Sequence, residues 1–223
     1  MTKRMPKKVL CLHGYSMNRE WFQSWLHSFE PRFNGRVEFI YPQAPIECPE
    51  AEVRDVWSRI NMPLPARRLG RGKNWSWYRA TAHTPPTYAG IDASLTLLAE
   101  TFEKDGPIEG IIGWSQGAIL ATVLIGELLR HRQPRFQFNW AVLCAGALPA
   151  DPRFQPDIAG PLTLPSLHVI GTKESVQMKH RCEALFNRFV GAERLDPPVG
   201  HVLPLHYPHY MDRIYDWINQ QMG

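Results

Sequence analysis

The chain has 223 residues, 44% of them hydrophobic, which is enough for one sizeable core and favours a single domain over residues 1–223. Its 25 basic and 21 acidic residues leave a net charge of +4, an excess too small to indicate a nucleic-acid partner but compatible with a small anionic substrate. No stretch approaches the ~20 apolar residues of a membrane span, and the apolar run 9–12 after the basic N-terminus is broken too soon for a secretion signal.

The four cysteines show no Cys-x-x-Cys spacing, which metal sites and redox motifs commonly use. Cys11 and Cys144 lie inside apolar runs, where buried thiols are common. We therefore expect a cytoplasmic protein that has no disulfide and needs no metal ion or cofactor.

The first forty residues predict two strands and a helix. Residues 7–14 form a short apolar run bounded by charge and glycine, which is typical of a strand buried in a parallel sheet, and residues 36–41 predict a second strand. Between them, large apolar residues recur at helical spacing over residues 21–29. We expect an amphipathic helix there, with Ser16 or Asn18 as its N-cap.

Regular periodicity fails over residues 43–86, where prolines, arginines and tryptophans take its place. A stretch of this length with little regular structure indicates a functional covering loop or disorder, and its aromatic content favours an ordered lid or pocket wall. The basic run at residues 67–73 is either a solvated loop or a contact for an acidic carrier or a phosphate-bearing thioester. Its cations are Arg67, Arg68, Arg71 and Lys73.

Helices and strands alternate through the second half of the chain. Because parallel strands need crossover helices, this alternation predicts an α/β fold, with a mostly parallel sheet covered by helices on both faces. Reactive groups then gather beyond the carboxyl ends of the strands. The expected helices cover residues 91–102, 117–130, 176–190 and 207–222, and the expected strands begin at Ile108 and cover residues 138–144 and 166–171, with a short one before Gly200.

The segment Gly113-Trp-Ser-Gln-Gly117 separates an apolar strand from a helix that is apolar nearly all round. A serine at the tip of such a turn has an exposed hydroxyl, and the flanking glycines let strand and helix approach closely. We predict Ser115 as a nucleophile. The alternative is a serine in an ordinary glycine-rich turn.

A serine nucleophile needs a histidine base, and in this fold type the base follows the serine in the chain. His201 in Gly200-His-Val-Leu-Pro204 is the predicted base. His206 and His209 are less suited, because they enter a helix and are expected to face solvent.

The third member of such a site is a carboxylate that holds the histidine. Glu174 follows the penultimate predicted strand by a few residues, which is the usual position. Asp151, after the preceding strand, and Asp196, five residues before the histidine, are the alternatives.

Attack by serine creates an oxyanion, which needs two N–H donors. The backbone N–H of Gln116, at the start of the helix, is the first predicted donor, and the N–H of Tyr15 is the second. We expect His13 to fix the Tyr15 loop through side-chain hydrogen bonds.

Five motifs occur in an order and spacing that resemble the FSH group, the "family of serine hydrolases" within the α/β-hydrolases. The resemblance implies a six-stranded α/β-hydrolase fold with little or no lid, and carboxylester or thioester hydrolase activity. It also implies Ser115 as nucleophile, His201 as base and position 174 as acid, where the family usually has aspartate and this chain has glutamate. The motifs are Leu12-His-Gly-Tyr15, Trp75-Ser-Trp-Tyr78, the segment 105–118, Gly171-Thr-Lys-Glu174 and Gly200-His-Val-Leu-Pro204.

The sequence thus predicts a serine hydrolase that cleaves small or lipid-like acyl esters through an acyl-serine intermediate. One alternative keeps this chemistry but cleaves acyl thioesters of a carrier protein or coenzyme A, and another is a non-catalytic binding protein on the same fold. Four aromatic residues are expected to form an apolar acyl pocket, unless they pack in the core. They are Trp75, Trp77, Tyr78 and Trp114.

Overall fold

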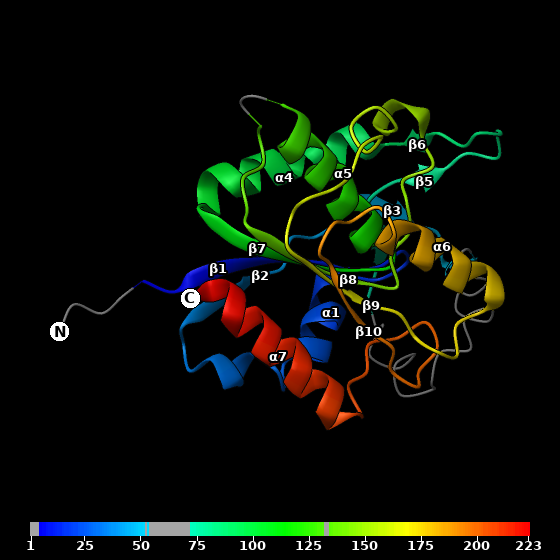
Figure 1. Cartoon of the computed structure of the whole chain (residues 1–223). Helices are drawn as coiled ribbons and strands as arrows, with labels where there is room; N and C mark the ends of the chain where they lie inside the picture. The colour runs from blue at the N-terminus through cyan, green and yellow to red at the C-terminus, as the bar shows by residue number, and fades with distance from the viewer. Residues whose placement is uncertain (1–4, 52, 54–71, 132–133) are drawn as a thin grey trace.

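A six-stranded sheet forms the centre of the molecule in a computed structural model that describes residues 5–51, 53, 72–131 and 134–223 (Figure 1). Every strand pairing in this sheet is parallel, and the strand order is β10-β9-β8-β7-β1-β2. The predicted parallel sheet is therefore confirmed. Its strands are β1 (Lys7–Leu12), β2 (Val37–Ile40), β7 (Ile108–Trp114), β8 (Trp140–Cys144), β9 (Ser166–Val169) and β10 (Glu193–Leu195).

Helices cover both faces of the sheet, as Figure 1 shows. Helices α4 (Ile91–Asp105) and α5 (Gln116–Arg130) share one buried apolar cluster with the sheet, and α6 (Val176–Phe186) contributes Leu185 to it. Helices α1 (Arg19–Leu26) and α7 (Pro208–Met222) share the cluster on the opposite face. None of the helices in the described part of the chain has the length and hydropathy needed to cross a bilayer.

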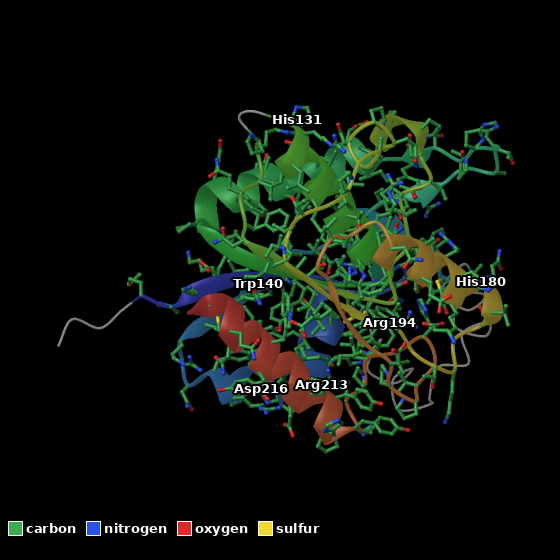
Figure 2. All side chains as sticks on the ribbon, viewed as in Figure 1. His131, Trp140, His180, Arg194, Arg213 and Asp216 are labelled. Atoms are coloured by element: carbon green, nitrogen blue, oxygen red, sulfur yellow. The ribbon has the colours of Figure 1, made fainter. Side chains whose placement is uncertain are left out.

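Helix α1 begins where its sequence provides a cap. The Asn18 Oδ1 atom accepts a hydrogen bond from the Trp21 N–H at 2.9 Å, so Asn18 is the N-cap and the alternative Ser16 is not. Trp21, Phe22 and Trp25 then turn one buried face toward the sheet. On the same side, Trp140 points from β8 toward α7 (Figure 2), and its ring meets that of Trp217 edge-on at 6.0 Å.

The stretch from residue 43 to 86 contains more regular structure than its sequence predicts. Strands β3 (Ile46–Cys48) and β4 (Asn74–Ser76) pair antiparallel, as do β5 (Arg79–Ala80) and β6 (Tyr88–Ala89). These strands are only two or three residues long, and β6 follows the stretch, so they add short pairings to the expected irregular insert. Residues 54–71, which include Arg67, Arg68 and Arg71, lie outside the described residues.

The described part of the chain also contains two short 3₁₀ helices, η1 (Glu30–Phe33) before β2 and η2 (Pro152–Phe154) after β8. The loop after β1 is tied to β4 by two backbone hydrogen bonds, from Met17 N to Trp75 O at 3.3 Å and from Trp75 N to Met17 O at 2.8 Å. This pairing brings the small β3–β4 sheet to the carboxyl end of β1.

Candidate active site

Ser115 lies in the turn between β7 and α5 with backbone angles φ 53° and ψ −114°, which residues with a side chain rarely adopt. Its N–H donates to the Cys144 carbonyl at 2.8 Å, which anchors the turn to the end of β8. A Cβ atom on Gly117 would overlap the Leu12 carbonyl group, so only glycine lets α5 approach β1 this closely. The sequence Gly-x-Ser-x-Gly therefore folds into a sharp turn at the carboxyl ends of three neighbouring strands.

His201 and Glu174 follow β10 and β9, and their side chains meet at this turn. His201 Nε2 lies 2.8 Å from Ser115 Oγ, and His201 Nδ1 lies 2.8 Å from Glu174 Oε1. The two loops that carry them are held together by backbone hydrogen bonds from Thr172 N to Pro197 O and from Lys173 N to Val199 O, both 2.8 Å. The structure thus brings the three predicted residues into one hydrogen-bonded series.

The donors and acceptors of this series fit a neutral imidazole. A carboxylate accepts only, so the Nδ1–H of His201 donates to Glu174, and Nε2 is left to accept the Ser115 hydroxyl proton. The Glu174 side chain is 3% exposed, and that of His201 is 13% exposed. Glutamate is one methylene longer than the aspartate implied by the resemblance, yet it reaches the imidazole at ordinary hydrogen-bond length.

The alternative acids have other partners. Asp151 is fully buried and accepts hydrogen bonds from Tyr88 N at 2.7 Å and from Arg153. Burial by itself raises the pKa of the Asp151 carboxyl, but these hydrogen bonds outweigh burial and hold the pKa below its usual value. Asp196 pairs with Arg194 at 2.6 Å. Neither carboxylate is bonded to His201, so the structure does not bring them into the series.

The alternative bases are on the surface. His206 and His209 are exposed, at and just before the start of α7, as their sequence positions predicted. The structure brings neither into the hydrogen-bonded series of Ser115.

The two predicted oxyanion donors come from segments that pack together. The Gly14 backbone lies so close to the Trp114 ring that a Cβ atom would overlap it, which brings the loop after β1 against the residue that precedes Ser115. Gln116 is the first residue of α5, so its N–H has no acceptor within the helix and lies at the positive end of the helix dipole. Tyr15 follows Gly14 directly, so its N–H belongs to this packed loop.

His13 is buried at the end of β1 and is bonded on both ring nitrogens. Its Nδ1 lies 2.8 Å from the Gly14 carbonyl oxygen, and its Nε2 lies 3.3 Å from the Ala44 backbone nitrogen. The Trp77 indole donates to the His13 carbonyl at 2.8 Å, and the two rings lie 5.0 Å apart. Burial lowers the pKa of His13 to about 4. These contacts fit the expected role of fixing the loop.

Three of the four aromatic residues expected in a pocket are packed in the core instead. Trp77 is fully buried, Tyr78 is 4% exposed and Trp114 is 3% exposed. The Trp114 ring lies 4.9 Å from Trp25 and 5.4 Å from the imidazole of His201. Their side chains therefore have too little free surface to line an open acyl pocket.

The Gln116 side chain has a function that the sequence did not reveal. Its Oε1 accepts from the Trp77 N–H at 2.9 Å, and its Nε2 donates to the Tyr78 carbonyl at 2.7 Å. The Ser94 hydroxyl also donates to the Trp77 carbonyl. A buried amide thus clamps the backbone that follows β4 onto the first turn of α5.

Trp75, the fourth aromatic residue, is half-buried and lines an open cavity of about 540 Å³, a volume typical of small-molecule sites. Lys73, the only cation of the predicted basic run that the structure describes, lines the same cavity and pairs with Glu47 at 2.8 Å. In the part of the chain that the structure describes, no group of three or more side chains is arranged to hold a metal ion. The remaining lining residues are Asn18, Arg19, Glu20, Gln43 and Gly72.

Sequence comparison identifies relatives that cover most of the chain. An esterase of Drosophila melanogaster, CG5412, is 30% identical over 198 residues, which span 88% of this chain and 68% of that protein. The esterase OVCA2 of Bos taurus is 30% identical over 207 residues, 90% of this chain and 91% of that protein. The human OVCA2 esterase is 29% identical over 214 residues, 93% and 94% of the two chains.

Solved structures with low sequence identity share the fold. The acyl-protein thioesterase 2 of Zea mays superposes with a TM-score of 0.63 at 20% identity, covering 100% of this chain and 96% of that chain. SOBER1 of Arabidopsis thaliana gives a TM-score of 0.60 at 15% identity, covering 98% and 100%. These likenesses are consistent with the α/β-hydrolase fold. Residues 1–212 match the family described as "Serine hydrolase (FSH1)", and the chain therefore belongs to this family of serine hydrolases.

Proposed function

We propose that this protein hydrolyses acyl esters, with Ser115 as nucleophile, His201 as general base and acid, and Glu174 as the carboxylate that orients His201. The observation that carries the proposal is the hydrogen-bonded series from Ser115 Oγ to His201 Nε2 and from His201 Nδ1 to Glu174 Oε1, with both distances 2.8 Å. The sharp backbone turn at Ser115 supports it, because such a turn exposes the hydroxyl to a substrate.

In the first half of the reaction, Ser115 Oγ attacks the carbonyl carbon of the ester and its proton passes to His201 Nε2. The imidazolium that results is stabilised by the Glu174 carboxylate. The carbonyl oxygen becomes an oxyanion, and the N–H groups of Tyr15 and Gln116 donate to it. His201 then returns the proton to the alcohol oxygen, and the alcohol leaves as the acyl-serine forms.

In the second half, water takes the place of the alcohol. His201 Nε2 accepts a proton from water, whose oxygen attacks the acyl carbon through the same oxyanion hole. The bond to Ser115 Oγ breaks, the serine regains its proton from His201, and a carboxylic acid is released. The names of the relatives, esterase CG5412 and esterase OVCA2, support an ester as substrate.

The ester hypothesis and the thioester hypothesis differ in the leaving group, which is an alcohol in the first and a thiol in the second. The same acylation mechanism cleaves a thioester, and one structural neighbour is named an acyl-protein thioesterase. The thioester hypothesis expects the basic run 67–73 to contact an anion. Lys73 is the only cation of this run that the structure describes, and it pairs with Glu47, so the described residues do not support this contact. Neutralising the four basic residues 67, 68, 71 and 73 should therefore leave ester turnover unchanged. A loss of thioester turnover alone would favour the thioester hypothesis.

The direct test is covalent labelling by a fluorophosphonate probe, which reacts with activated serines. The wild-type chain should be labelled, and Ser115→Ala and His201→Ala should not. Ser175→Ala is the matched control, since this exposed serine caps α6 one residue after Glu174 and should not alter labelling. A wild-type chain that resists the probe would reject the enzyme and favour a non-catalytic binding protein.

A further inference from the structure

A series of hydrogen bonds runs from the N-terminus of α1 to the peptide that carries the second oxyanion donor. The Arg19 N–H donates to Gln43 Oε1 at 3.1 Å. The other end of the Gln43 amide, Nε2, lies 3.3 Å from His13 Nε2, and His13 Nδ1 lies 2.8 Å from the Gly14 carbonyl oxygen. Three side-chain and backbone groups thus connect a helix end to the Gly14–Tyr15 peptide.

The backbone groups at the two ends fix the direction of every bond in the series. A backbone N–H only donates, so the Gln43 oxygen faces Arg19 and the Gln43 NH₂ group faces the imidazole. His13 Nε2 must then be the acceptor, and the Ala44 N–H at 3.3 Å donates to the same nitrogen. Two donors at Nε2 leave the ring proton on Nδ1, from which it is donated to the Gly14 carbonyl.

The position of the Gly14 carbonyl determines the direction of the Tyr15 N–H. Both groups belong to one planar peptide unit, and in a trans peptide they point in opposite directions. The structure's cis peptides lie elsewhere, at Pro85 and Pro107. A His13 ring that holds the carbonyl on one side therefore turns the Tyr15 N–H to the other side.

The hydrogen-bond series from Arg19 through Gln43 and His13 to Gly14 lies beside the nucleophile, and its imidazole stays in one protonation state at neutral pH. The Gly14 backbone packs against Trp114, the neighbour of Ser115. Burial lowers the pKa of His13 to about 4 and outweighs the opposing effects of the Gly14 carbonyl and the Glu20 carboxylate. Protonation of Nε2 would also direct an N–H at two N–H donors.

We infer that Gln43 is a positioning residue for the oxyanion hole, which together with the Ala44 N–H holds the imidazole ring of His13 in place and through it the orientation of the Tyr15 N–H. The inference rests on the proposed function, in which this N–H stabilises the oxyanion. Gln43 acts through His13 and not on the substrate, so its loss should slow the chemical step and leave substrate binding unchanged.

The test compares Gln43→Met, which keeps the length of the side chain but has no amide, with the wild-type chain. The kcat for a chromogenic ester should fall about 3- to 10-fold with KM within twofold, less than the 10²- to 10³-fold typical of losing a whole oxyanion donor, because the Ala44 N–H still bonds to His13. Gln23→Met is the matched control: it makes the same substitution at an exposed position of α1, outside the cavity and the hydrogen-bond series. It should leave kcat unchanged.

Two further measurements separate positioning from a general loss of structure. The ¹⁵N imidazole shifts of His13 should report protonation on Nδ1 in both chains, but the Nε2 resonance and the Tyr15 amide resonance should move in Gln43→Met, because Nε2 loses one of its two donors and the ring is held less firmly. In a His13→Asn background, Gln43→Met should have no further effect on kcat. If His13→Asn does not fold, the NMR measurement on Gln43→Met still decides the matter.

An unchanged kcat in Gln43→Met would overturn the inference, and so would a fall in kcat with the His13 and Tyr15 resonances unchanged. A rise in KM alone would also overturn it and would make Gln43 a substrate contact. Failure of the proposed function is distinguishable, since the wild-type chain would then lack both ester turnover and fluorophosphonate labelling.

Discussion

Replacing Ser115 by glycine is expected to stabilise the fold while abolishing hydrolysis. At φ 53° and ψ −114° the residue occupies a region that glycine enters freely and other residues enter at a cost of about 1–3 kcal/mol. Glycine has more conformational entropy to lose on folding, which offsets about 0.5–1 kcal/mol of that gain. The relief of strain is the larger of the two effects, so Ser115→Gly should raise the free energy of unfolding.

The clean comparison is between Ser115→Gly and Ser115→Ala. Both variants lose the hydroxyl and its hydrogen bond to His201, so only the backbone effect separates them. The free energy of unfolding should be about 0.5–2 kcal/mol higher for the glycine variant, and at roughly 2–4 °C per kcal/mol for a chain of this length the midpoint should rise by about 1–8 °C.

Urea and thermal unfolding of the two variants provide the assay. Asn34→Gly is the control, because Asn34 has φ 50° and ψ 40° in the left-handed region that asparagine tolerates, and its unfolding free energy should stay the same or fall by up to about 1 kcal/mol. A glycine variant no more stable than the alanine variant would refute the claim that the nucleophile turn stores strain.

Three further predictions concern the acid, the clamp and a buried imidazole. Glu174→Gln should lower kcat about 10³-fold or more, since the imidazole loses its orienting carboxylate, whereas Asp151→Asn and Asp196→Asn should keep near-normal turnover; normal kcat in the first variant would reject the assignment. Gln116→Met should lower the free energy of unfolding by about 2–4 kcal/mol in urea titrations, because two buried backbone groups lose their partner, while activity of the folded variant persists through the retained N–H. Burial lowers the pKa of His168 to about 3, so the stability that depends on its neutral form is complete above pH 6.5 and is lost as the pH falls. Between pH 7 and 4.5 the free energy of unfolding should fall by about 2.5 kcal/mol more in the wild-type chain than in His168→Gln. Equal losses in the two chains would contradict this.

The central sheet was predictable because its strands leave a strong local pattern. Parallel strands buried on both faces must be short and apolar, and the runs at β1, β7 and β8 have that composition. Ser115 was predictable for a related reason: the strand before it, the helix after it and the flanking glycines are adjacent in sequence. The positions of Glu174 and His201 followed from the order of strands.

The remaining features depend on pairings that adjacent residues do not record. Strand β3 pairs with β4 across an interval of more than twenty residues, and neither strand is long enough to show an alternating pattern. The sequence gives no sign that the Gln116 side chain is buried and bonded, because its partners are the backbone groups of Trp77 and Tyr78, which any residue type carries. The two tryptophans of the Trp-Ser-Trp motif also differ in burial, since Trp77 is fully buried and Trp75 is half-buried. This difference depends on how the motif packs against distant parts of the chain.

The order of the strands has a consequence for biosynthesis. The proposed site draws on the ends of β1, β7, β9 and β10, and His201 follows the last strand to be synthesised. A nascent chain that has reached β8 already carries Ser115 and both oxyanion donors but lacks the histidine and the glutamate. Hydrolytic competence should therefore arise only after the edge strand β10 has joined the sheet, so a partly synthesised chain has a serine with no base to activate it.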